Sequence, residues 1–225
     1  MKRHSLIVLP ILSLVAVACD ARVPSETSAA NTSPSETVAA DSAPGKTVEA
    51  DTSAAAFGGP FSLIDQNGKR RTDMDFRGKY MLMFFGYTYC PDVCPTTLAV
   101  EAEALDKLGS QASRIVPIFI TVDPKRDTPD KLKSYLSAFD AKPPSVRSNF
   151  VGLTGTNEEI AKTAEAYRVY YQAHIDGRTQ DGYSIDHTGD VYLMDPEGKF
   201  VAYYSQGILP DELAADLKSK TRSPG

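Results

Sequence analysis

Cysteine and histidine are both scarce in this chain of 225 residues. Its three cysteines are too few for a framework of disulfide bonds. Its three histidines are the whole supply of imidazole for a metal site. The six residues are Cys19, Cys90, Cys94, His4, His174 and His187.

The chain also lacks an excess of positive charge. Its formal net charge is -5, and it becomes -7 without the two positive charges of Lys2 and Arg3. A nucleic-acid-binding protein needs a basic patch, and the composition offers none. Nucleic acid is therefore not an expected partner.

Long apolar runs are absent as well. The run over residues 6–18 is too short to cross a membrane, which takes about 20 apolar residues. It follows Lys2 and Arg3 and ends in small residues, a pattern typical of a cleaved export signal. We therefore predict that residues 1–18 are a signal peptide.

The end of this signal resembles that of a bacterial lipoprotein, in which a cysteine becomes the lipidated first residue. That cysteine is Cys19; the sequence departs from the pattern in having Ala16, where leucine is usual. The resemblance implies an exported protein anchored by lipid to the cell membrane. Asp20 implies the periplasmic face of the inner membrane if the cell is Gram-negative. The alternative is an ordinary export signal followed by a chance cysteine.

Residues 19–56 have a different composition from the rest. After Cys19 they are rich in Ala, Ser, Thr, Glu and Pro, and repeats of similar sequence begin at Pro24, Pro34 and Pro44. Such a segment buries too little apolar surface to offset the entropy lost on ordering, and a β-repeat would need an apolar face in each unit. We predict a disordered tether.

Residues 57–220 alternate between strand and helix patterns, which predicts one α/β domain, followed by a disordered tail at 221–225. An apolar run at 79–87 indicates a strand buried on both faces, and Thr128 and Pro129 indicate a helix start. Predicted strands cover 60–65, 79–87, 114–122, 150–155, 167–175, 181–186 and a hairpin within 191–205. Predicted helices cover 95–108, 127–139, 157–167 and 210–220.

Cys90 and Cys94 lie between the buried strand and the helix expected from residue 95. A helix N-terminus favours a thiolate, which both metal binding and thiol exchange require. A purely structural disulfide would close too small a loop to add much stability. Structural zinc usually takes four protein ligands, and these are hard to assemble here.

Copper fits the available residues better, because thiolates select Cu(I) and imidazole tolerates both oxidation states. His187 ends a predicted strand and is the best third ligand. His174 lies near a polar loop and is expected to be an exposed bystander. Asp92 and Asp186 flank the ligands; they either tune their charge and orientation or are solvated loop carboxylates.

Three segments resemble the Sco/SenC family of copper-binding proteins: FFGYTYCPDVCPTT, FITVDPKRDTPDKL and YSIDHTGDVYLMDPEGKF. The resemblance implies a thioredoxin-like fold, with a central mixed sheet flanked by helices and an inserted β-hairpin. It also implies that each domain binds one copper, as Cu(I) or Cu(II), through Cys90, Cys94 and His187.

The same resemblance implies a metallochaperone that serves the copper-bearing subunit of cytochrome c oxidase, with other copper chaperones as further partners. A second hypothesis is a metal-independent thiol-disulfide oxidoreductase, in which Cys90 and Cys94 form a redox-active pair. A third is a copper or redox sensor. A polar loop at Asp123, Arg126 and Asp127 either contacts a partner or caps the next helix.

Overall fold

The computed structural model describes residues 47–49, 57–140, 149–175 and 182–221. All of them belong to one compact unit, Ser42–Gly225. The predicted signal peptide, Cys19 and most of the predicted tether and tail lie outside the described residues. Within the described part, no helix is both long and apolar enough to cross a membrane.

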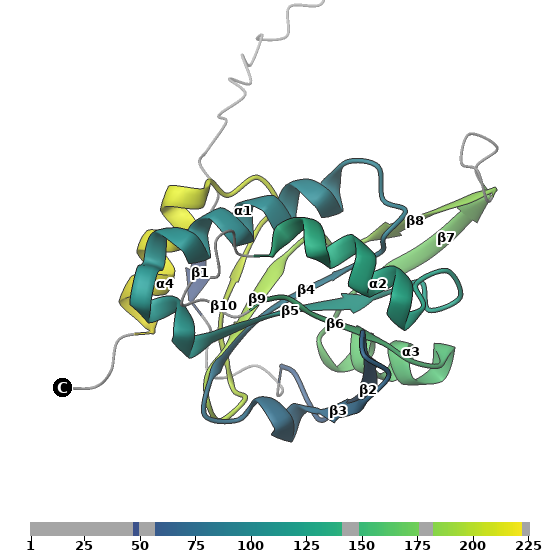
Figure 1. Cartoon of the computed structure of the whole chain (residues 1–225), viewed down its shortest axis with the longest axis horizontal. Helices are drawn as coiled ribbons and strands as arrows, with labels where there is room; N and C mark the ends of the chain where they lie inside the picture. Colours follow the sequence, from purple (N-terminus) through teal and green to yellow (C-terminus); the bar gives the residue numbers. More distant parts are fainter. Residues whose placement is uncertain (1–46, 50–56, 141–148, 176–181, 222–225) are drawn as a thin grey trace, which may run out of the picture. The chain divides into compact units, whose positions relative to one another are not determined.

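The main sheet is mixed and has eight strands in the order β1-β10-β9-β4-β5-β6-β2-β3 (Figure 1). A separate two-stranded sheet, β7-β8, extends beyond it. The strands are β1 Thr47–Glu49, β2 Ser62–Asp65, β3 Arg70–Thr72, β4 Tyr80–Gly86, β5 Ile115–Thr121, β6 Val151–Thr154, β7 Tyr171–Ile175, β8 Tyr183–His187, β9 Val191–Met194 and β10 Phe200–Tyr204.

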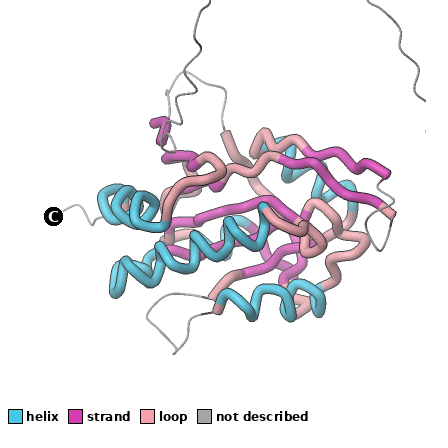
Figure 2. Tube along the Cα trace, turned by 90° about the horizontal axis from the view of Figure 1, so that it is seen from above, coloured by secondary structure: helices cyan, strands magenta, loops and turns pink. Residues whose placement is uncertain are grey.

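Four α-helices cover the sheet: α1 Val93–Leu108, α2 Pro129–Leu136, α3 Asn157–Ala166 and α4 Pro210–Lys220. Helices α1, α2 and α4 lie over one face and α3 over the other; Figure 2 shows the same helices from above. Three short 3-10 helices complete the elements: η1 Asp73–Phe76, η2 Gly109–Arg114 and η3 Ser137–Phe139.

Strands β4, β5 and β6 are parallel neighbours. Parallel strands require crossover connections, and right-handed crossovers place α1 and α2 on the same face. Every residue of β5 and all but the first of β4 are buried, which agrees with helices covering both faces. The loops after β4 and β5 meet at one edge of the sheet, where Gly86 pairs with Thr121.

Most of the predicted elements are present, including the hairpin β9-β10 and the capped start of α2. The Thr128 hydroxyl accepts a hydrogen bond from the amide of Lys131 at 3.3 Å, and Pro129 begins the helix. The sequence patterns did not indicate β3 or η1. Helix α1 begins at Val93, two residues earlier than predicted.

The packed region is slightly longer than residues 57–220. Strand β1 lies within the predicted tether and pairs antiparallel with β10. Thr221, in the predicted tail, is fully buried, and its amide donates to the Leu217 carbonyl at 2.9 Å. Both ends of the domain therefore extend beyond the predicted boundaries.

Candidate metal centre

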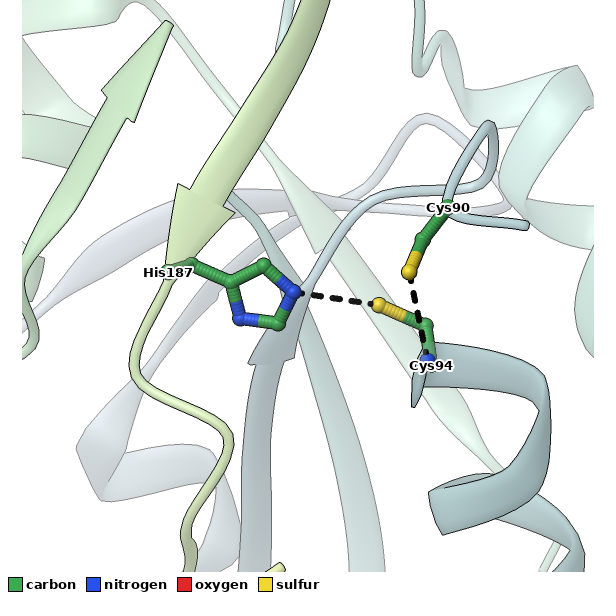
Figure 3. A group of neighbouring side chains, drawn as sticks. All are labelled: Cys90, Cys94 and His187. Atoms are coloured by element: carbon green, nitrogen blue, oxygen red, sulfur yellow. Dashed lines mark hydrogen bonds between the residues drawn. The ribbon is translucent and has the colours of Figure 1, made fainter. Parts of the chain in front are cut away.

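Cys90, Cys94 and His187 form a cluster at the end of β4 (Figure 3). Cys90 lies in the loop that follows β4, Cys94 lies in the first turn of α1, and His187 is the last residue of β8. Their ligand atoms all lie within 4.8 Å of one another. Among the described residues this is the one group of three or more His, Cys, Asp or Glu side chains able to hold a metal ion.

Both cysteines are free thiols, and they interact through the start of the helix. The amide of Cys94 donates to the Cys90 sulfur at 3.4 Å, so the helix N-terminus faces Cys90. Cys94 itself is fully buried and packs against Gly86. A Cβ atom at Gly86 would lie only 2.7 Å from the Cys94 sulfur, so the close approach of helix and strand requires glycine there.

The two thiols have opposite acidities. Hydrogen bonding from the Cys94 thiol is the main cause that lowers the pKa of Cys90 to about 4, with further lowering by His187 and by the amides of Cys94 and Asp92. Burial raises the pKa of Cys94, and its interaction with Cys90 raises it further. Without a metal, Cys90 is therefore the thiolate and Cys94 retains its proton at neutral pH.

The ring of His187 is oriented with one nitrogen toward the sulfurs. Nε2 lies 3.3 Å from the Cys94 sulfur, and Nδ1 lies 3.0 Å from the carbonyl oxygen of Thr188. A carbonyl only accepts, so Nδ1 donates to it, and Nε2 is the ring nitrogen that faces the cysteines. The edge contacts of the ring with Phe84 and Tyr87, at 6.0 and 5.8 Å between centroids, hold it in this direction.

This donor set fits a soft metal ion. Two sulfurs and one imidazole are typical copper ligands, and thiolates favour Cu(I). A closed structural zinc site takes four protein ligands, and the described residues bring three together. The residues present therefore suit copper better than zinc.

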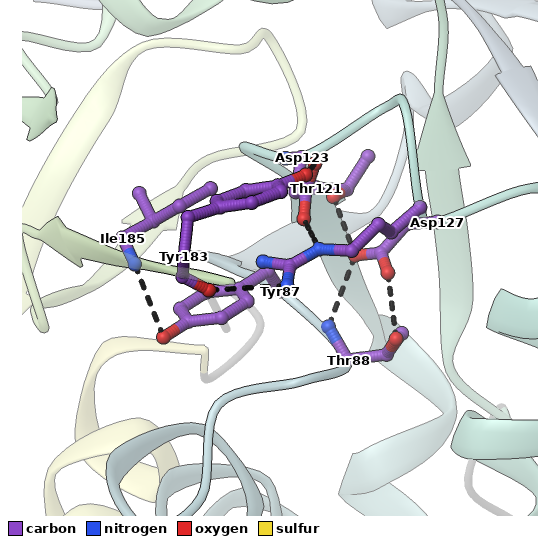
Figure 4. A network of polar contacts seen from close by, with 8 residues as sticks. Tyr87, Thr88, Thr121, Asp123, Asp127, Tyr183 and Ile185 are labelled. Carbon is purple, nitrogen blue, oxygen red and sulfur yellow. Dashed lines mark hydrogen bonds and ion pairs between the residues drawn. The ribbon is translucent and has the colours of Figure 1, made fainter. Parts of the chain in front are cut away.

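A buried carboxylate anchors the loop that carries Cys90 (Figure 4). Asp127 accepts hydrogen bonds from the Thr88 amide at 3.0 Å, from the Thr88 hydroxyl at 2.6 Å and from the Thr121 hydroxyl at 2.6 Å. It is fully buried and lies in the loop after β5. Asp127 thus joins the ends of the two central strands and fixes the chain two residues before Cys90.

A second group of contacts joins the loops after β4 and β5 to the hairpin β7-β8, which carries His187. Arg126 pairs with Asp123, donates to the Tyr183 carbonyl at 3.2 Å and stacks over the Tyr183 ring at 3.6 Å. The Tyr183 hydroxyl donates to Asp123 at 2.8 Å, and the Tyr87 hydroxyl accepts from the Ile185 amide at 3.3 Å (Figure 4). The position of β8 therefore depends on side chains of the neighbouring loops.

The other predicted residues lie at the edge of the site. Asp92 is exposed at the N-cap of α1, and its amide contributes to the low pKa of Cys90. Asp186 is exposed, and one of its carboxyl oxygens lies 2.9 Å from Nε2 of His174, which is also exposed. An effect of either carboxylate on a bound metal stays a prediction. Cys19 and His4 lie outside the described residues.

The sequence patterns did not assign roles to Gly86, Tyr87 or Thr88. Gly86 ends an apolar strand and Tyr87 and Thr88 follow it, and nothing in their types marks contacts with Cys94, Ile185 or Asp127. The polar loop at Asp123, Arg126 and Asp127 is predicted to contact a partner or to cap the next helix; in the structure its side chains contact Thr121 and Tyr183 within the chain, and Thr128 caps the helix. The only available signal was its place at the same sheet edge as the cysteines.

The sequence model of the family described as SCO1/SenC matches residues 49–222. The human protein named "Protein SCO1 homolog, mitochondrial" is 40% identical over 167 residues, which are 73% of this chain and 53% of the human protein. The chain thus spans about half the length of that relative.

Two solved structures extend the comparison. The structure of Bradyrhizobium japonicum ScoI with copper bound has a TM-score of 0.64 and 48% identity, covering 73% of this chain and 99% of that one. A structure of BsSco has a TM-score of 0.58 and 25% identity, covering 76% of this chain and 98% of that one. That structure is described as identifying a disulfide switch in BsSco, a member of the Sco family of cytochrome c oxidase assembly proteins.

Proposed function

Because the chain belongs to the SCO1/SenC family, we propose that it binds one copper ion through Cys90, Cys94 and His187 and delivers it to the copper-bearing subunit of a cytochrome c oxidase. The observation that carries the proposal is the convergence of these three ligand atoms within 4.8 Å from separate parts of the fold. The copper held by the Bradyrhizobium relative and the oxidase assembly named for BsSco support it.

The chain's own residues account for copper capture. The Cys90 thiolate is available at neutral pH, and Cys94 loses its proton when the metal binds. Two thiolates suit Cu(I), whereas Cu(II) depends more on the imidazole of His187. Loss of the imidazole would leave the copper on two thiolates, from which a partner's ligands can take it.

The direct test is copper loading of the reduced protein under anaerobic conditions, followed by metal analysis. We expect one copper per chain, and a fall in bound copper in Cys90→Ala and Cys94→Ala. Transfer is then measured by mixing the loaded protein with the soluble copper domain of an oxidase subunit. If copper stays on the donor, or if the cysteine variants bind as the parent does, the proposal fails.

We also propose that the protein works at a membrane surface. Residues 1–18 would be removed, Cys19 would carry the lipid, and the segment from residue 20 to the start of β1 at Thr47 would act as a tether. Such a tether lets the domain reach a membrane-embedded oxidase while staying attached. Mass spectrometry of the protein from membranes tests this: an unmodified Cys19, or a mature N-terminus elsewhere, contradicts it.

A second candidate function is thiol-disulfide exchange, favoured by the opposite acidities of the two thiols. The Cys90 thiolate would attack a target disulfide, and Cys94 would then displace the target from the mixed disulfide. The target gains two electrons and two protons and becomes a dithiol, while Cys90 and Cys94 become a disulfide. His187→Ala separates the two functions, because exchange needs no third metal ligand. Reductase activity that persists in this variant while copper transfer is lost would show that both occur, since Cys94, the main cause of the low pKa of Cys90, remains.

A further inference from the structure

A cavity of about 260 Å³ lies beside the copper ligands and shares chain segments with them. Asp92 and Val93, at the start of α1, line it on one side, and Gly189, two residues after His187, lines it on another. The remaining walls come from α1, β9, α4 and the segment before α4, and they include Val100, Glu101, Val191, Gln206 and Leu213.

Glu101 is the unusual member of this lining. Its side chain is fully buried, and neither carboxyl oxygen has a hydrogen-bond partner. Buried polar groups in folded proteins are almost always hydrogen-bonded, because an unpaired one is costly. The carboxyl oxygens of Glu101 lie in the wall of the cavity with almost no accessible surface, so an occupant would satisfy them once the side chain turns toward the cavity.

The charge of the residues that line the cavity indicates which class of ligand it could bind. Asp92 and Glu101 are its two ionisable residues, both acidic, and no Lys, Arg or His of the described residues lines the cavity. Valine, isoleucine and leucine side chains form much of the wall. An anion finds no positive group here, and a hard metal ion such as Ca²⁺ takes six to eight oxygen ligands, more than two carboxyl groups supply.

We propose that this cavity binds an organic cation with an apolar stem, either an alkylammonium ion or the end of a lysine or arginine side chain. The charged group would pair with Glu101, and the stem would pack on Val100, Val191 and Leu213. Burial raises the pKa of Glu101. A cation beside the carboxyl group would lower that pKa again and so favour the ionised form. The occupant would contact the segments that carry the cysteines and His187.

The test uses the full chain, reduced and copper-free, and n-butylammonium chloride as the probe. Binding is followed by NMR from the amides of Val100, Gly189 and Gln206, and n-butanol serves as a neutral probe of similar shape. We expect saturable shifts with the ammonium ion and at least tenfold weaker binding of the alcohol. Glu101→Gln should weaken ammonium binding at least tenfold.

Glu103→Gln is the matched control, because it removes the same charge from an exposed position of the same helix. It should bind n-butylammonium as the parent does. Val100→Phe provides a second variant that fills the cavity and leaves Glu101 intact, and it should abolish binding. Equal affinity for n-butanol, or unchanged binding in Glu101→Gln, would overturn the proposal.

A comparison of two ligands then identifies the source of the cation. If Nα-acetyl-lysine methylamide binds at least as tightly as n-butylammonium, the cavity accepts a side chain presented by a protein. If the lysine amide is excluded while n-butylammonium binds, the occupant is a free amine. If neither ligand binds, the cavity is not a cation site.

Discussion

The Nε2 atom of His187 lies 3.3 Å from the Cys94 sulfur, although 93 positions separate the two residues in the sequence. Cys94 belongs to α1, which covers the main sheet, and His187 ends a strand of the separate β7-β8 sheet. The metal centre is therefore complete only when this hairpin packs against the cysteine loop.

Replacing His187 tests its role as a copper ligand. We expect His187→Ala to lower Cu(II) affinity at least tenfold and to change the Cu(II) absorption spectrum, because the imidazole is the ligand that suits Cu(II). Cu(I) binding should fall less, since both thiolates remain. His174→Ala is the control, because His174 pairs with Asp186 in the same hairpin. Identical Cu(II) spectra for His187→Ala and the parent protein would exclude His187 as a ligand.

The acidity of Cys90 can be measured by alkylation. Its pKa of about 4 means that the reduced, copper-free protein should react with iodoacetamide at Cys90 almost as fast at pH 6 as at pH 8. An ordinary thiol, with a pKa of about 8.5, would slow by roughly a factor of 80 over that range. Mass spectrometry of the labelled peptides reports the rate for each cysteine.

Cys94→Ala provides the control for this measurement. It removes the hydrogen bond that contributes most to the low pKa of Cys90, so the rate profile should move to higher pH. A profile in the parent protein with its midpoint near pH 8, or one that Cys94→Ala leaves unchanged, would contradict the assignment.

Glu101 should make stability depend on pH. Burial raises its pKa well above the usual 4.5, so the unfolded chain releases this proton at a lower pH than the folded protein. The free energy of unfolding should therefore fall as pH rises above 4.5, by up to about 1.4 kcal/mol per unit until the folded-state pKa is reached.

Glu101→Gln removes this dependence. In urea unfolding of the copper-free proteins, the free energy of unfolding of the variant minus that of the parent should therefore increase from pH 5 to pH 8. Glu103→Gln, at an exposed position, should follow the parent at each pH. A constant difference between Glu101→Gln and the parent would show that Glu101 ionises normally.

Asp127 is not a proposed copper ligand, and it should support the site only by anchoring the loop that carries Cys90. Asp127→Ala leaves the Thr88 amide and the hydroxyls of Thr88 and Thr121 without their acceptor, which should cost about 2–4 kcal/mol of stability. It should also weaken copper binding, because the loop that carries Cys90 is no longer fixed. Asp130→Ala, an exposed position in the next helix, should change both quantities little. Normal copper affinity in a folded Asp127→Ala protein would mean that the loop needs no anchor.

Much of the fold could be predicted because its central strands and helices carry strong hydropathy patterns. The run in β4 and the Thr128-Pro129 start of α2 are local signals, and local signals are visible in a sequence. Strand β3 has three residues, all charged or polar, and gains its place by pairing with β2. No periodicity of its own could reveal it.

The residues of the candidate site also differ in how far the sequence indicates them. Cys90 and Cys94 are close in sequence and precede a predicted helix, so the sequence indicates them directly, whereas His187 is one of three histidines and is distant from both cysteines in the sequence. The position of Glu101 was not foreseen. It follows Val100 and precedes Ala102 in an amphipathic helix, and it lines a cavity whose other walls include segments near residues 189 and 205–208. Such tertiary burial has no sequence pattern.

The last prediction concerns the hairpin that completes the site. Strands β7 and β8 pair only with each other among the described strands. Their base is held by the Thr188 amide, which donates to the Tyr170 carbonyl at 2.9 Å, and by the contacts from Arg126 and Tyr87. Apart from that backbone hydrogen bond, the attachments are side-chain contacts and not a strand ladder shared with the main sheet, which predicts low local stability without a metal.

A copper ion bound by His187 and by the two cysteines would link the hairpin to the start of α1 and thereby stabilise the hairpin. A Cys90–Cys94 disulfide removes both thiolates, so it should prevent copper binding and leave the hairpin as open as in the reduced, copper-free form. Hydrogen exchange of the amides of residues 183–190 in the three forms measures this. We expect strong added protection with copper and none with the disulfide. Equal protection in all three forms would mean that the hairpin is fixed by its protein contacts alone, and that copper release does not begin with movement of His187.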